Sequence, residues 1–404
     1  MKKLIWMSSL SYLVIGMAHV VAGAILEPLL AQYGLDYQSG GQFIMNQFLG
    51  FLGGVLLTPW LSSKLGRRNT LLLALGSLTV AEGLYSLFLP WGWMLAIAPV
   101  AGFGFGMTEA IIGAMIIEYV EEKKASAMTF IETFFGVGAL MMPIIAALLI
   151  KNGVWELSFP IVAAVSGVAF LLWAFMSFGH VDQLMARRPQ ADSSIAQPVI
   201  RQRYPRWALP ILVLGVLYFA LYVGMEMSFS NYLPSIMIER LGLNEAEAAS
   251  TISMFWGLMV VGRLLAGRVA EWSGYGRFLL IMTGAGMLSL IVLSFVSQAG
   301  WSLFVIGLSG LVWAGVFAIG LVYINQLLPG YTERTTSLLV AAGGLGGALF
   351  PKLTGWLMDT YNASWTMAML SGLTLVMLVI MIVLLLVERV RIRQIRSESQ
   401  IRSN

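Results

Sequence analysis

Long apolar runs separated by short polar connections follow one another along almost the whole chain. A helix needs about 20 apolar residues to cross a bilayer, and longer runs can be accommodated by tilt. The pattern therefore predicts twelve membrane-spanning helices. They cover about 8–30, 41–63, 70–89, 93–120, 126–150, 154–178, 207–237, 246–272, 277–298, 301–328, 333–358 and 362–387.

One polar stretch, 179–206, is much longer than the other connections and is rich in Arg, Asp, Ser, Gln and Pro. It divides the twelve runs into six and six. We therefore expect an all-α membrane protein with an N-terminal six-helix bundle (1–178), a linker (179–206), a C-terminal six-helix bundle (207–388) and a tail (389–404).

The two halves repeat each other. The pattern Gly-x-Gly-x4-Pro occurs at 136–143 and again at 344–351, a constant offset of 208 residues. The same offset places the Gly-Met pair at 16–17 over the pair at 224–225. Duplicated halves with a site near their common midplane are typical of secondary transporters, so we predict two bundles related by a pseudo-twofold axis.

Basic residues gather on one side of the predicted topology. If the termini and every second connection share a side, only Lys151, Arg240 and Lys352 of the 24 Lys and Arg residues fall on or toward the other side. The positive-inside rule then places both termini and the linker in the cytoplasm of a plasma-membrane protein. The small residues at 22–24 resemble a signal-peptidase site, but the apolar run continues beyond them, so we expect a retained first span.

The composition excludes several classes of protein. With 58% hydrophobic and 11% charged residues, the chain falls far below the roughly 25% charged residues of soluble domains. It has no cysteine and only two histidines, and it lacks the phosphate-binding loop of ATP-driven pumps. We expect no enzyme, no metal site, no cofactor and no nucleic-acid partner.

A polar stripe marks the apolar segment 217–238, where Tyr218, Tyr222, Glu226 and Ser230 recur every four residues. Such residues share one slowly drifting face of a helix. A carboxylate at membrane depth is costly unless it faces a cavity or a partner, so it indicates a functional site. Pro234 is expected to loosen the helix just beyond the stripe. The alternative is that these groups only bond neighbouring helices.

Three further side chains are candidates, with Glu226, for carrying protons. Glu109 lies midway along the fourth span on a face lined by glycines, which allow a neighbouring helix to approach closely. Glu132 lies in the fifth span and His19 in the first. Each has a structural alternative, a hydrogen bond between helices.

Amides, tyrosines and tryptophans would suit a polar but uncharged solute, since they hydrogen-bond its edge and stack on its apolar face. The substrate-binding candidates of this kind are Gln42, Asn46, Gln47, Tyr218, Tyr222, Trp256, Trp313 and Asn325. The first, second, fourth and seventh spans contain no arginine at mid-membrane depth, so an anionic solute has no obvious clamp there. Arg263 and Lys352 are placed near the ends of their spans.

The basic turn at 62–68 resembles the cytoplasmic motif of the major facilitator superfamily, although Ser63 stands where that motif usually has an aspartate. The pattern Gly262-Arg263-x3-Gly267-Arg268 is interpreted as its partner in the second half. The alternative for both is simple positive-inside anchoring.

The chain resembles the major facilitator superfamily over essentially its whole length. More narrowly it is similar to the fucose–galactose–glucose:proton symporter family, especially the glucose/mannose:proton symporters of Gram-positive bacteria. The resemblance rests on Gly224-Met-Glu226, Asn231-Tyr-Leu-Pro234-Ser-Ile-Met237, Thr108-Glu109, Gly136-Val-Gly138-Ala-Leu140 and Gln47-Phe-x-Gly50-Phe.

The resemblance implies sugar uptake coupled to a proton on a membrane-embedded acid, first of all Glu109, and it adds Asn231 to the substrate-binding candidates. Fucose permease relatives also carry an aspartate in the first span, where this chain has His19 and Glu27. Glu226 is therefore expected to take part in coupling instead.

The sequence thus predicts a proton-coupled symporter for a sugar-like small molecule, working as a monomer in the lipid bilayer. The alternative is a drug or metabolite:proton antiporter. Such exporters carry a glycine-proline pair in the fifth span, whereas Pro143 here follows Met142. A non-transporting receptor or scaffold would leave the buried acids without a purpose.

Overall fold

A computed structural model describes residues 2–119, 124–179, 182, 185 and 204–403. The N-terminal half contains α1 (Lys2–Ala24), α2 (Leu26–Tyr33), α3 (Tyr37–Leu65), α4 (Arg67–Tyr85), α5 (Trp91–Tyr119), α6 (Lys124–Lys151), the short 3-10 helix η1 (Trp155–Leu157) and α7 (Ser158–Phe175). The C-terminal half contains α9 (Ala208–Leu241), α10 (Glu245–Ser273), α11 (Tyr275–Phe295), α12 (Ala299–Trp313), α13 (Val316–Leu327), α14 (Thr332–Thr360) and α15 (Ala363–Ser403).

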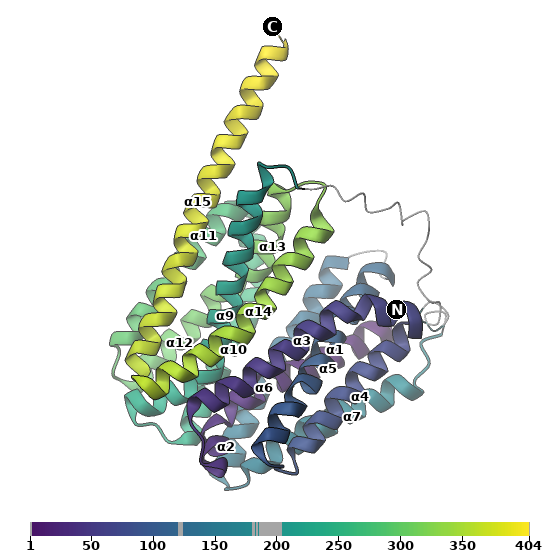
Figure 1. The fold of residues 1–404 in the computed structure, drawn as a ribbon, viewed down its shortest axis with the longest axis vertical. Helices are drawn as coiled ribbons and strands as arrows, with labels where there is room; N and C mark the ends of the chain where they lie inside the picture. Colours follow the sequence, from purple (N-terminus) through teal and green to yellow (C-terminus); the bar gives the residue numbers. More distant parts are fainter. Residues whose placement is uncertain (1, 120–123, 180–181, 183–184, 186–203, 404) are drawn as a thin grey trace.

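The two halves form two helical bundles that lie side by side (Figure 1). Eleven helical segments of the described chain are long and apolar enough to cross a membrane. The twelfth place is taken by α4, which packs against α5 and α7 and is less apolar because it contains Arg67, Arg68 and Glu82. The prediction of a multi-pass, all-α protein with twelve spanning helices in two six-helix bundles is confirmed.

Two predicted spans are broken rather than continuous. The first divides at Ile25 into α1 and α2, and Pro28 follows in the first turn of α2, where a proline costs no helical hydrogen bond. The tenth divides at Ala314 and Gly315 into α12 and α13. Pro234, which was expected to loosen the seventh span, does not interrupt it: α9 runs through this residue as one helix of 34 residues.

The linker lies almost entirely outside the described residues. At the other end of the chain, α15 continues without interruption through 389, where the tail was expected to begin, and projects alone beyond the bundle (Figure 1).

Equivalent glycine contacts reproduce the 208-residue offset in three dimensions. Gly102 of α5 lies against the carbonyl of Gln47, and Gly310 of α12 lies against the carbonyl of Phe255. Gly54 and Phe103 in the first half correspond in the same way to Gly262 and Leu311 in the second. Since each pair differs by 208, the two bundles use the same close helix crossings.

The halves contact each other through α3 with α14, α6 with α10, and α1 with α9. We call the end of the molecule that carries Lys2 and Thr332 the termini face, and the end that carries Tyr37 and Thr360 the opposite face. At the opposite face Gly41 of α3 lies against the backbone of Pro351 on α14. Closer to the middle, Gly347 of α14 lies against the ring of Phe48.

Asp359 of the C-terminal half caps a helix of the N-terminal half. Its carboxylate accepts hydrogen bonds from the backbone N–H groups of Tyr37 (2.9 Å) and Gln38 (2.6 Å), in the first turn of α3. Asp36 accepts from the N–H of Ser39, and hydrogen bonds from the side chain and the backbone of Ser39 hold the pKa of Asp36 below its ordinary value. The first N–H groups of a helix lack partners within it, so one bundle here satisfies donors of the other.

Candidate functional site

The centre of the interface between the halves contains an arginine. Arg263 follows Trp256 and Met259 on one face of α10, as their spacing of three and four residues requires. Its guanidinium lies 5.7 Å from the ring centre of Trp256 and 5.9 Å from that of Phe135 on α6. Its Nη2 approaches the sulfur of Met259 at 3.6 Å. A cation between an N-terminal and a C-terminal ring therefore bridges the two halves.

Three carboxyl groups lie within electrostatic reach of Arg263: Glu109 on α5, Glu132 on α6 and Glu226 on α9. Arg68 and Asp182 form an ion pair elsewhere, but no described carboxylate comes within 4.0 Å of the Arg263 guanidinium. Arg263 is thus placed between three acids rather than paired with one. His19 also lies within electrostatic reach of Arg263, so all four predicted proton-carrying residues interact with the same cation.

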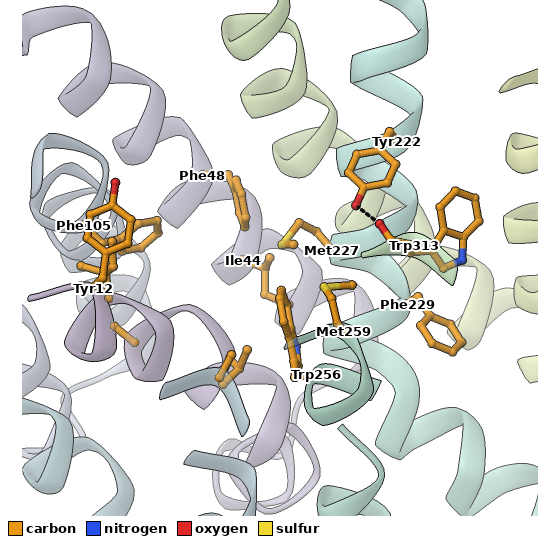
Figure 2. Close-up of a cluster of buried hydrophobic side chains, with 14 of the residues drawn as sticks. Tyr12, Ile44, Phe48, Phe105, Tyr222, Met227, Phe229, Trp256, Met259 and Trp313 are labelled. Atoms are coloured by element: carbon orange, nitrogen blue, oxygen red, sulfur yellow. Dashed lines mark hydrogen bonds between the residues drawn. The ribbon is translucent and has the colours of Figure 1, made fainter. Parts of the chain in front are cut away.

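Glu226 is buried, with 7% of its surface exposed. The hydroxyl of Tyr222, one turn earlier on α9, donates to its Oε1 at 2.9 Å and also lies 3.2 Å from the backbone oxygen of Trp313. The rings of Tyr222 and Trp313 lie 5.8 Å apart, and Figure 2 shows them on the same side of the central cluster. The structure therefore brings together Tyr222, Glu226 and Trp313, as a shared binding site for substrate and proton would require.

Glu109 and Glu132 lie close enough to interact electrostatically, and both side chains are half-buried. Tyr12 of α1 lies beside them: its hydroxyl donates to the backbone oxygen of Glu109 at 3.4 Å, and it is within electrostatic reach of both acids. The N-terminal half thus contributes two acids to the centre and the C-terminal half contributes one.

His19 lies at the pseudo-twofold axis. Its Nε2 lies 2.9 Å from the sulfur of Met227, and residues 19 and 227 differ by the repeat offset of 208. Two equivalent residues can touch only near the axis that relates them. Around the imidazole, the rings of Phe48, Phe105 and Phe135 stand edge-on with centres 5.2–5.5 Å away. His19 therefore lies in an aromatic cage where the halves meet.

Two more candidates lie on the C-terminal wall of this centre. The indole Nε1 of Trp256 donates to the hydroxyl of Ser230 at 2.9 Å, so the indole ring is fixed against α9. The amide of Asn231 donates to the backbone oxygen of Met227 and packs against Gly23 of α1. Asn231 and Gly23 also differ by 208, which places this contact near the axis as well.

Gln42 and Asn46 belong to a polar chain across the halves, nearer the opposite face. Lys352 of α14 donates to the side-chain oxygen of Gln42. Gln42 donates to Asn46 at 2.8 Å, and Asn46 donates to the backbone oxygen of Leu95 at 3.0 Å. Placing Lys352 near a span end was correct, but the lysine turns inward and joins the two predicted amides.

Three candidates lie away from the centre. Tyr218 bonds Thr283 of α11 within the C-terminal bundle. Gln47 is buried beside Tyr85 of α4, inside the N-terminal bundle. Asn325 of α13 donates to the backbone oxygen of Leu321 and to Thr336.

Placing Arg263 with the basic turns was wrong. Gly66 and Gly274, which differ by 208, form the equivalent turns with φ of 80° and 87°. Arg263 lies about three helical turns before Gly274, and its half-buried side chain contacts the rings of Trp256 and Phe135. An arginine two turns after a tryptophan in an apolar helix was the available signal. Nothing in the sequence around Tyr12 or Met227 singled out those two side chains.

Comparison with known proteins places this geometry in a family. The profile described as Major Facilitator Superfamily matches residues 8–351. A similar relative is the glucose/mannose transporter GlcP of Bacillus subtilis (strain 168), 29% identical over 394 residues, which cover 96% of this chain and 94% of that protein. The sodium-dependent glucose transporter 1A of Mus musculus is 23% identical, with 87% of this chain and 88% of the relative covered.

Solved structures show the same fold at low identity. A D-xylose-proton symporter superposes with a TM-score of 0.75 at 15% identity, covering 93% of this chain and 96% of the other. The nucleoside transporter NupG superposes with a TM-score of 0.72 at 13% identity, covering 95% and 98%.

Proposed function

The chain belongs to the major facilitator superfamily, whose members are transporters rather than enzymes, and from that premise we propose that it is a proton-coupled symporter for a sugar or similar small polar solute. The observation that carries the proposal is the placement of Arg263 among Glu109, Glu132 and Glu226, between two bundles that can rock against each other. We propose that one chain suffices, since both walls of this centre come from the same molecule.

The charge balance supports coupling to a proton. Three ionised carboxylates and one guanidinium leave an excess of two negative charges in a centre of low dielectric, which is costly to close off from water. Protonation of one acid removes part of this cost. When that acid is neutral, a neighbouring ionised acid can also pair with Arg263, which reduces the cost further. A carrier with this arrangement closes more readily when it is loaded with protons.

The lining supports a neutral, hydroxyl-rich solute. Tyr222, Trp256 and Trp313 offer ring faces, while Glu226, Gln42 and Asn46 offer hydrogen bonds at the edges. Sugars have this mixture of an apolar face and polar edges. The names of GlcP and of the xylose symporter point to the same class of substrate.

Uptake of labelled glucose into proteoliposomes tests the proposal. An imposed inward proton gradient is expected to drive accumulation above the external concentration, and collapsing the gradient is expected to abolish it. Accumulation driven only by sodium would contradict proton coupling, and movement of cationic drugs without any sugar would favour the antiporter alternative.

The same vesicles test the pocket. Glu226→Gln keeps an oxygen that can accept from the Tyr222 hydroxyl but replaces a charged acceptor by a neutral one. A hydrogen bond to a charged group contributes roughly 1–1.5 kcal/mol more than a neutral one, so we expect about a tenfold loss of solute affinity, measured by competition in counterflow. Glu271→Gln, on the termini side of the same bundle, is the matched control and is expected to bind normally.

We propose that the termini face is cytoplasmic. The chain has no cysteine, so a single cysteine reports its own side of the membrane. Ser193→Cys, in the linker and outside the described residues, is expected to resist an impermeant thiol reagent added to intact cells. Asn152→Cys, in the exposed connection after α6, is expected to react. The reverse pattern would overturn the orientation.

A further inference from the structure

A second buried acid, Glu82, lies inside the N-terminal bundle and has no place in the proposed transport centre. It lies on α4, has no exposed surface, and neither of its carboxylate oxygens has a hydrogen-bond partner among the described residues. No charged side chain of the described chain acts on it electrostatically. A buried carboxylate without donors or a counter-charge is strongly unfavourable, so Glu82 is either protonated or bound to a partner that the described side chains do not supply.

Two other orphaned polar groups lie next to it. The hydroxyl of Tyr85, one turn later on α4, and the Nε2 of Gln47 on α3 are buried and lack hydrogen-bond partners in the described structure. Tyr85 lies within electrostatic reach of the Glu82 carboxyl and interacts with the side chain of Gln47. The three groups are therefore neighbours inside one bundle.

The surroundings fix these groups and keep them away from the pathway. The ring of Tyr85 packs between Phe43 of α3 and Phe159 of α7, with centres 5.2 and 5.1 Å away. Ser158, next to Phe159, also has a buried hydroxyl without a partner in the described chain. All of these residues belong to the N-terminal bundle, so the arrangement does not depend on contact between the halves.

We propose that Glu82, Tyr85 and Gln47 bind a monovalent metal cation, with sodium as the natural occupant. The carboxylate, the phenol oxygen and the amide oxygen are hard ligands of the kind that such cations prefer. One carboxylate balances one positive charge, whereas a divalent ion would leave a net charge buried. Turning the Gln47 amide would present its oxygen to the ion, and amide orientation follows the bonding network.

Thermal unfolding of the purified full-length protein tests this site without any transport measurement. At constant ionic strength, replacing choline chloride by sodium chloride is expected to raise the midpoint of unfolding saturably, because a ligand of the native state stabilises it. Glu82→Gln is expected to abolish the sodium-dependent rise. Glu156→Gln, on the exposed connection before α7, is the control and is expected to keep it.

Tyr85→Phe keeps the ring packing and removes only the oxygen ligand, so it decides the question if Glu82→Gln does not fold. We expect it to raise the sodium concentration for half-maximal stabilisation several-fold. A wild-type midpoint that ignores sodium would overturn the proposal and indicate a protonated Glu82. A sodium effect unchanged in either variant would also overturn it, because the ion would then bind elsewhere. Failure of sugar uptake has no bearing on these outcomes.

Discussion

Glu109→Gln is expected to abolish uphill accumulation of the solute, so that its ratio across the vesicle membrane falls to about 1, while exchange of the solute down its own gradient continues. The amide has the volume of the protonated acid but can neither release nor take up a proton. Glu109 is half-buried between Tyr12, Glu132 and Arg263, where an ionised carboxylate would oppose closure of the empty carrier. This cost of closing the empty carrier prevents proton leakage. Glu109→Gln removes the cost at every pH, because the amide is never ionised.

The measurement is accumulation of labelled sugar in proteoliposomes over a series of pH values, together with counterflow at equal pH on both sides. Loss of accumulation and of its pH dependence, with counterflow retained, would assign the coupling proton to Glu109. Glu156→Gln is the exposed control and should behave as the wild type. Accumulation by Glu109→Gln with wild-type pH dependence would instead transfer the role to Glu226 or Glu132.

The fold was largely predictable because it follows from the length and spacing of apolar runs. An offset of 208 residues was read from the glycines and prolines at 136–143 and 344–351. The same offset relates helix contacts outside that motif, such as those of Gly102 and Gly310. The breaks at Ile25 and at Ala314 and Gly315 were not predicted. Ile25 is not a helix-breaking residue, and a glycine such as Gly315 does not identify a break, because α5 and α14 run unbroken through several glycines.

The site was only partly predictable, because a sequence gives the spacing along a helix but not the direction in which each face points. Asn46 and Gln47 are adjacent, so their side chains point about 100° apart. Asn46 joins Gln42 and Lys352 across the halves, whereas Gln47 turns into its own bundle. Residues four apart drift by about 40° per step, which takes Tyr218 to α11 while Tyr222 stays at the centre.

Arg263 shows the same limit for charge. The sequence placed Arg263 near the end of its span and therefore near the termini face. In the structure α10 packs against α6 and α12, and Arg263 lies within electrostatic reach of three acids. That one guanidinium interacts electrostatically with Glu109, Glu132 and Glu226 becomes visible only when helices far apart in sequence are packed together.

Gly41→Ala is expected to shift the protein away from the conformation in which the opposite face is closed. A Cβ at Gly41 would lie 2.6 Å from the backbone oxygen of Pro351 and 2.7 Å from the Cα of Lys352. Both atoms belong to the backbone of the other bundle, so they cannot move aside as a side chain can, and relief requires the bundles to separate there. Overpacking of this kind costs about 1–3 kcal/mol, which corresponds to roughly a 5- to 150-fold change in the population ratio.

Gly53→Ala is the matched control on the same helix. A Cβ there meets nothing within 4 Å, and both substitutions raise helix propensity equally, by about 1 kcal/mol, so the difference between them isolates the contact across the halves. Spin labels on Ala31→Cys and Thr360→Cys, exposed on the two sides of the opposite face, report the separation by pulsed electron resonance. We expect a longer distance population in Gly41→Ala and an unchanged one in Gly53→Ala. Equal distance distributions in the two variants would show that the close approach of α3 and α14 does not hold this face closed. The closing contacts would then be the bonds of Asp359 and Lys352, which a bulkier residue 41 can leave intact.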